Sequence, residues 1–188
     1  MNTALIVAAA LVVILVLMYN SLVAKKNEVE NIFASVDTLL KKRYDLIPNL
    51  VASVKEYMQY EKDLLEKVTK LRTKAMNPNI SDEEKIELDK EVTALLGSIM
   101  VAVENYPELK ANENLLHLQH TLAEIEAQIS AARRAYNQAV TDYNNAIEMI
   151  PTNIMANMMG YRRKEVFSID ESERKNVDIK KLFSEGDR

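Results

Sequence analysis

The sequence predicts an all-α fold, in which an N-terminal transmembrane helix continues into an antiparallel bundle of three to four long helices. Three observations support this fold class. The 188 residues include only 3 glycines and 4 prolines, so the chain has little material for turns. Apolar residues recur three or four positions apart through long segments, which is the spacing of one helix face. Residues 3–24, finally, contain no Asp, Glu, Lys, Arg or His.

Residues 3–24 have the length and composition of a membrane span. About 22 residues at roughly 1.5 Å each give roughly 33 Å, close to the hydrocarbon thickness of a bilayer. A cleaved signal peptide is the alternative, but Met1-Asn2-Thr3 carries no basic side chain and no small-x-small site precedes a polar stretch. Lys25 and Lys26 follow the span, so the positive-inside rule predicts a single-pass protein of the cell membrane whose bulk is cytoplasmic.

The chain is therefore divided into an anchor at 1–24, a helical bundle at 25–160 and a charged tail at 161–188. Apolar side chains are sparse in the tail, which we expect to lie on the bundle or to extend freely from it. The chain has no cysteine, which excludes a disulfide framework and a thiolate nucleophile. A net charge of -4 on mixed signs provides no basic face for nucleic acid. Because no glycine-rich phosphate loop is present either, we expect neither a cofactor nor an enzyme.

The first helix of the bundle is predicted from residue 27 to about residue 76, along one stripe of apolar residues. Pro48 lies inside it. Proline has no N–H for the Tyr44 carbonyl and its ring crowds that turn, so the helix is expected to kink or restart there. Asp45 is placed to cap a restarted turn.

The segment around this proline is the candidate structural or interaction motif, and it comprises Arg43, Tyr44, Asp45, Pro48 and Asn49. Arg43 falls on the apolar stripe, so we expect its guanidinium to be at least half buried and bonded to carbonyls or carboxylates. Two interpretations stay open at this point. Arg43 either forms a local ion pair with Asp45 in a core helix or serves as a docking group for an anionic partner.

Two further long helices follow this one. Ser81 and Glu84 form a capping box, which predicts a helix from there to residue 105. A helix over residues 113–149 is predicted from a seam of apolar residues in steps of three and four, the pattern of bundle or coiled-coil packing. Residues 151–160 are expected to add a small helix that caps the end of the bundle.

The lengths of these helices predict self-association. At about 1.5 Å per residue, the first helix beyond the membrane is roughly 78 Å long, and the two later helices are roughly 36 and 55 Å. They cannot cover one another, so the membrane-proximal stripe of Ile32, Val36 and Leu39 has no obvious partner within one chain. Side-by-side anchoring in one bilayer concentrates such stripes. We therefore expect a homo-oligomer, with coverage of the stripe by the tail as the alternative.

One helix face offers a candidate metal site. His117 and His120, with Glu113 and Glu124, lie near one face of the third predicted helix. A carboxylate-bridged site of the four-helix type needs matching ligands from other helices, and only this segment carries histidine. These positions also lie off the apolar seam, so exposed side chains are the favoured interpretation. A metal-binding protein or an enzyme that uses this face is the alternative function.

Several separated motifs resemble the LemA family. They are the segment around Pro48 and residues 104–114, 118–119, 132–137, 143–144 and 151–153. Lys42 stands where an arginine is common in that family, and Tyr161 stands where phenylalanine is usual. The resemblance implies a bacterial single-span membrane protein with a helical-bundle domain and no settled biochemical activity. It also implies that some relatives carry a lipid-attachment cysteine in place of this anchor, which puts their bundle outside the cytoplasm.

Together these features predict a membrane-anchored scaffold or interaction protein that self-associates at the membrane. Its expected partners are the lipid bilayer, further copies of the chain and other proteins, whereas nucleic acid is not expected to bind.

Overall fold

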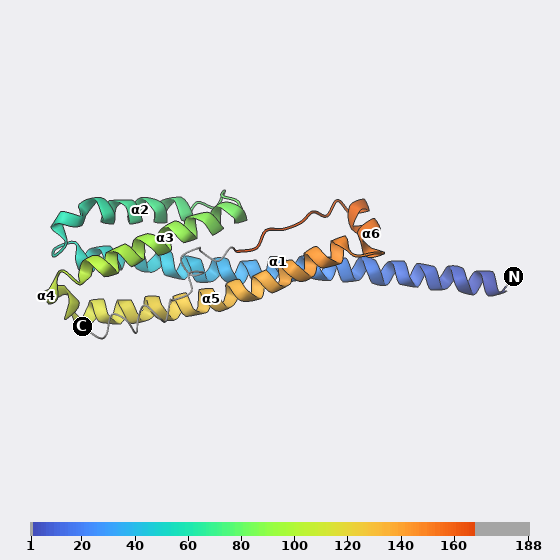
Figure 1. Ribbon diagram of the computed structural model, residues 1–188, viewed down its shortest axis with the longest axis horizontal. Helices are drawn as coiled ribbons and strands as arrows, with labels where there is room; N and C mark the ends of the chain where they lie inside the picture. The colour runs from blue at the N-terminus through green and yellow to red at the C-terminus, as the bar shows by residue number, and fades with distance from the viewer. Residues whose placement is uncertain (1, 168–188) are drawn as a thin grey trace, which may run out of the picture.

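The computed structural model describes residues 2–167, and helices account for nearly all of that part of the chain (Figure 1). The elements in chain order are α1 (Asn2–Val54), the short 3-10 helix η1 (Gln59–Glu61), α2 (Lys62–Ala75), α3 (Asp82–Val103), α4 (Pro107–Lys110), α5 (Glu113–Glu148) and α6 (Thr152–Met158). Within the described residues no strand forms, so the all-α prediction is confirmed.

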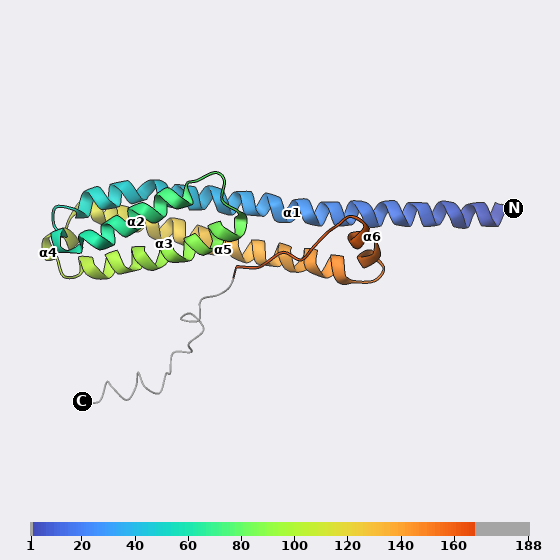
Figure 2. The same ribbon diagram turned by 90° about the horizontal axis from the view of Figure 1, so that it is seen from above.

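Helix α1 is the axis of the molecule. Its N-terminal part extends alone, and its second half lies against the other long helices in an up-down-up-down arrangement (Figures 1 and 2). Helix α5 runs back along α1 and forms the most extensive helix pair, while α2 and α3 pack on each other as a hairpin. Helix α3 makes its main contact with α2 rather than with α1 or α5.

The first part of α1 is the candidate membrane span. Among the described helices, α1 is the one that is long and apolar enough to cross a membrane. Its apolar side chains are exposed as far as Leu17, which is 62% exposed, whereas Leu22 is fully buried. The bundle therefore begins at the last turns of the apolar segment, and no loop separates the two parts because α1 stays helical through both.

The first bundle helix is shorter than the sequence predicts. Helix α1 stays helical through Pro48, so the expected restart there is wrong, and it ends at Val54 rather than continuing to about residue 76. The chain reverses over residues 55–61, and α2 then runs back beside α1. No glycine or proline marks this turn, which is held instead by the fully buried side chain of Met58.

Helix α5 covers the part of α1 that follows its apolar N-terminal segment. Val36 is fully buried, and Ile32 and Leu39 are partly buried against the core. Phe33 on α1 packs against Tyr136 on α5, with ring centroids 5.4 Å apart. The expectation that this stripe lacks a partner within one chain is therefore wrong, because α5 returns over it and the first helix is shorter than assumed.

Residues 161–167 lie in extended form along α5. Gly160, with φ at 69°, ends α6 in a left-handed conformation that favours glycine and turns the chain back. Asn144 then bonds both the N–H and the carbonyl of Lys164, at 3.0 and 2.9 Å. Asn137 does the same for Phe167, at 2.8 and 3.0 Å. The rest of the predicted tail, residues 168–188, lies outside the described residues.

Candidate functional site

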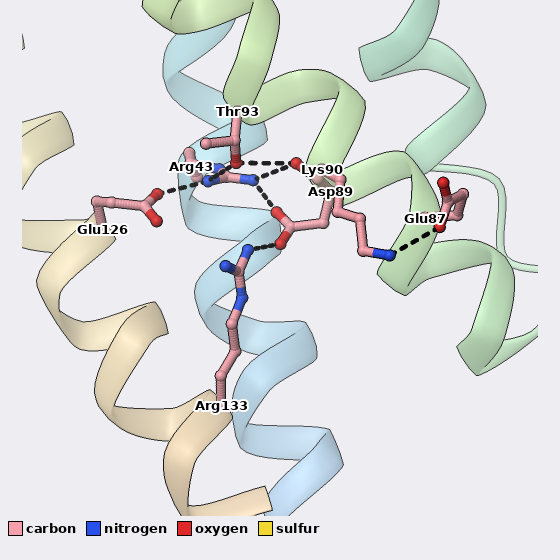
Figure 3. A network of polar contacts seen from close by, with 7 residues as sticks. All are labelled: Arg43, Glu87, Asp89, Lys90, Thr93, Glu126 and Arg133. Atoms are coloured by element: carbon pink, nitrogen blue, oxygen red, sulfur yellow. Dashed lines mark hydrogen bonds and ion pairs between the residues drawn. The ribbon is translucent and has the colours of Figure 1, made fainter. Parts of the chain in front are cut away.

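The candidate site is a buried ion network centred on Arg43 of α1. Arg43 is 1% exposed, as its place on the apolar stripe predicts. Its Nη1 donates to Glu126 Oε2 of α5 at 2.6 Å and to Thr93 Oγ1 of α3 at 2.9 Å. Its Nη2 donates to the backbone carbonyl of Asp89 at 3.3 Å and forms an ion pair with the Asp89 carboxylate (Figure 3).

Asp89 is the second centre of this network. It is 0% exposed on α3 and forms ion pairs with both Arg43 and Arg133, the latter from α5. Two guanidinium groups thus face two carboxylates, those of Asp89 and Glu126, so the charges of the network balance. The network joins three helices, and it matters most for α3, which otherwise packs mainly on α2.

The partners of Arg43 differ from those that the sequence suggested. Asp45 is exposed and pairs with Lys41 at 3.0 Å, one helical turn before it. The expected ion pair between Arg43 and Asp45 is therefore wrong, because the two side chains lie on different faces of α1. The guanidinium is also buried and already pairs with Asp89 and Glu126, which favours the structural interpretation.

Pro48 has a defined role in the same region. It cannot donate to the Tyr44 carbonyl, and Arg72 of α2 donates to that carbonyl from Nε at 3.0 Å. Asp45 lies 3.9 Å from Arg72 and adds a weaker ion pair. The proline thus frees an acceptor on α1 that α2 uses for docking. Asn49, the last member of the motif, is exposed.

Tyr44 completes the buried side of the motif. Its ring lies under the Arg43 guanidinium, with 5.8 Å between the guanidinium carbon and the ring centroid. Its hydroxyl is buried with no hydrogen-bond partner among the described residues. Burial raises the pKa of Tyr44 to about 12, an effect that the charge of Arg43 partly opposes. The hydroxyl is therefore neutral over the physiological range.

A surface groove lies directly beside the network, between α3 and α5. It has a volume of about 570 Å³, its lining includes Leu96, Met100 and Leu122, and Glu104 and Glu126 supply its acidic groups. Gly97 also lines it, and a Cβ at this position would have no atom within 4 Å. Since glycine inside a helix costs stability relative to alanine, packing does not explain its presence here.

The histidine face is arranged differently from a metal site. His120 Nδ1 lies 3.4 Å from Glu124 Oε1, and both side chains are exposed. In the region from residue 2 to residue 167, no group of three or more His, Asp or Glu side chains is placed to hold a metal ion. His117 and Glu113 accordingly do not form a ligand cluster with this pair.

Sequence reasoning identified Arg43 but missed Asp89, Glu126 and Arg133. Asp89 carried a usable signal, because it lies three positions from Ile86 and from Val92 on the buried face of α3. A charged residue within an apolar stripe is the same signal that identified Arg43. Glu126 and Arg133 offered no such signal, since both lie at the edge of the α5 seam and are partly exposed.

Comparison with known proteins agrees with this structure. "Protein LemA" of Metamycoplasma hominis is 28% identical over 163 residues, which cover 87% of this chain and 74% of the relative. "Magnetosome protein MamQ 2" of Paramagnetospirillum magneticum is 24% identical over 183 residues, or 84% of this chain and 67% of the relative. These relatives and the apolar N-terminal helix indicate a membrane-associated helical protein. Because the model of the LemA family matches residues 32–180, the chain belongs to the LemA family.

Proposed function

We propose that the protein is a single-span membrane scaffold that holds an interaction surface at a fixed height above the bilayer. The observation that supports this proposal is the continuity of α1, which is both the anchor and a core helix of the bundle. From Lys25 to Val54 it extends the bundle by roughly 45 Å at about 1.5 Å per residue. A continuous helix of this kind fixes where the bundle lies relative to the bilayer. This role requires no metal ligands beyond those present among the described residues.

The groove between α3 and α5 is the surface that best suits this role. It is lined by apolar side chains and by Gly97, and its two carboxylates already pair with cations of the chain, Glu104 with Lys110 and Glu126 with Arg43. The buried network fixes the two helices that form its walls. We expect it to accept an apolar segment of a partner protein, because Leu96, Met100 and Leu122 supply its apolar lining.

Single cysteines in a chain that has none test this function. Gly97→Cys lies in the groove, and Ser98→Cys lies on the next position of the same helix, outside the groove lining. A thiol-reactive crosslinker added to native membranes should give a discrete adduct with Gly97→Cys only, identifiable by mass spectrometry. Equal adducts at both positions, or none, contradict the groove as the interaction surface.

The alternative function uses the histidine face. Metal analysis of the purified full-length protein tests it, with the His117→Ala/His120→Ala double variant as the control. Stoichiometric metal that is lost in the double variant supports the alternative and counts against a pure scaffold. We expect no such difference, because His120 and Glu124 are exposed and lack further ligands among the described residues.

Self-association at the membrane is part of the proposal, and its support is that all copies share one bilayer. It cannot use Val36 without opening the bundle, since that side chain is fully buried. Light scattering in lipid nanodiscs assembled at increasing protein loading measures it directly. A monomer at every loading contradicts self-association.

The orientation of the bundle is also a proposal. Lys25 and Lys26 follow the span, and Arg162 and Arg163 lie on the segment that returns from the same end of the bundle. By the positive-inside rule, these cations support a bundle that lies in the cytoplasm. Protease added to intact cells should leave the bundle uncut. Replacing Lys25 and Lys26 by Gln while adding lysines after Met1 should make it accessible from outside.

A further inference from the structure

Helix α6 presents an unusual surface at the membrane end of the bundle. Ala156 is buried, and Met155 and Met159 are partly buried against the core, so one face of the helix packs inward. The opposite face is also apolar, because Ile154 is 63% exposed and Met158, one turn later, is 84% exposed. Met149 and Ile150, in the turn before α6, are exposed as well.

These four side chains form one patch, here called the α6 patch: Met149, Ile150, Ile154 and Met158. The other large apolar side chains exposed in the described bundle are the pair Tyr57 and Tyr60, and the separate residues Val101, Leu116 and Val166. Scattered apolar residues are normal on a protein surface, whereas a cluster of them usually marks a contact.

The position of the α6 patch identifies what it contacts. Both views show α6 beside α1 at the point where the isolated part of α1 meets the bundle (Figures 1 and 2). Leu17 is exposed and Leu22 is buried, so the change from lipid-facing to bundle-facing side chains falls between them. Residues 3–24 make roughly 33 Å, which puts Leu22 near the edge of the hydrocarbon layer. The patch therefore lies at the level of the bilayer surface.

Charges around the patch agree with this placement. Lys25 and Lys26 follow the span on α1, and Arg162 is exposed just after α6. Arg163 pairs with Glu148, and Lys26 pairs with Glu30 at 3.4 Å, so these cations are partly neutralised by acids of the protein. Lys25 and Arg162 make no ion pair within the described residues, which suits them to anionic headgroups.

We propose that the α6 patch is a second membrane contact, which inserts Met149, Ile150, Ile154 and Met158 into the boundary between headgroups and acyl chains beside the anchor. Through this contact α6, which is distant from α1 in sequence, also touches the lipid. It restricts the direction in which the span can tilt, because tilting away from α6 lifts the patch out of the lipid. The proposal depends on anchoring through α1, which flotation of the reconstituted protein with vesicles tests separately.

Single tryptophans test the contact cleanly, since the natural chain contains none. The full-length variants Ile154→Trp and Met158→Trp probe the patch, and Val101→Trp, at a position that is 71% exposed on α3, is the matched control. Each is reconstituted into phosphatidylcholine vesicles containing phosphatidylglycerol, with and without lipids brominated along the acyl chain. We expect blue-shifted emission and several-fold stronger bromine quenching for the two patch variants than for Val101→Trp.

Quenching equal to that of the Val101→Trp control at both patch positions overturns the proposal. If the emission is blue-shifted without bromine quenching, and the shift disappears as protein is diluted in lipid, the patch binds a second copy and the proposal is also wrong. Two patch variants are used because one substitution can disturb α6, which the helical signal in circular dichroism reports. Arg162→Gln should weaken the quenching in the anionic vesicles but not in vesicles of phosphatidylcholine alone.

Discussion

Arg72 donates a hydrogen bond from Nε to the carbonyl of Tyr44, 3.0 Å away, and this is the carbonyl that Pro48 leaves without its helical donor. The proline and the arginine therefore act together, although they lie on different helices. A proline inside a helix is usually a cost to stability. Here it also provides the acceptor through which α2 is attached to α1.

This relationship predicts a coupled pair of substitutions. Arg72→Met should lower the free energy of unfolding by about 1 to 2 kcal/mol, because it leaves the Tyr44 carbonyl unpaired. The same change in a Pro48→Ala background should cost less, since alanine restores the N–H of the helix. Thermal unfolding of the full-length protein in detergent measures the four variants of the cycle. Equal costs of Arg72→Met in both backgrounds contradict the coupling.

Removing Arg43 should be much more damaging than removing an exposed lysine. Arg43→Met leaves Asp89 buried with only Arg133 as a partner, which predicts a loss of about 3 to 5 kcal/mol. Lys41→Met is the control on the same helix, because its pair with Asp45 is exposed and should contribute less than about 1 kcal/mol. Unfolding curves with the same midpoint for the two variants would show that the network is not structural.

Alkaline conditions should destabilise the bundle through its buried tyrosines. Burial raises the pKa of Tyr44 and of Tyr136 to about 12, whereas the unfolded value is 10.0. The contribution of the two raised pKa values to the free energy of unfolding is fully present below pH 10. It is lost as the pH rises through 12, because the tyrosines of the unfolded chain release their protons at lower pH than those of the folded chain. Tyr44→Phe should reduce the loss between pH 10 and pH 12 by roughly 2 kcal/mol and leave stability at pH 7 nearly unchanged. If the free energy of unfolding of Tyr44→Phe falls between pH 10 and pH 12 as steeply as that of the wild type, the loss does not come from Tyr44.

The two described glycines should respond to alanine in opposite directions. Gly97→Ala should raise the free energy of unfolding by about 0.5 to 1 kcal/mol, since it fits the space and improves helix propensity. Gly160→Ala should lower it by about 1 kcal/mol, because φ at 69° is strained for an L side chain. Denaturant unfolding compares them.

Local signals in the sequence were sufficient for most of the helices. The capping box at Ser81 and Glu84 forms as expected and starts α3. The seam of the third predicted helix places α5 within one residue of its observed end, since Glu148 is the last helical residue. A capping box and an apolar seam are formed by residues a few positions apart, so both can be recognised in the sequence alone.

The reversal after Val54 depended on contacts that no local pattern records. Tyr57 and Leu64 continue the apolar spacing across the turn, so the pattern indicated one helix where there are two. The turn exists because Met58 is buried and Arg72 reaches α1, and both are tertiary contacts. The same limit applies to Glu126, whose role depends on which helix faces Arg43.

Because α1 is one continuous helix, a tilt of its apolar segment also moves the bundle at its other end. Bilayers of different thickness change the tilt of a span, and no loop interrupts α1 between its apolar segment and Val54. A tilt of about 10° acting over roughly 45 Å moves the far end of the bundle by about 8 Å. A protein held at that end would then be displaced sideways whenever the membrane thins or thickens, without any change inside the bundle itself.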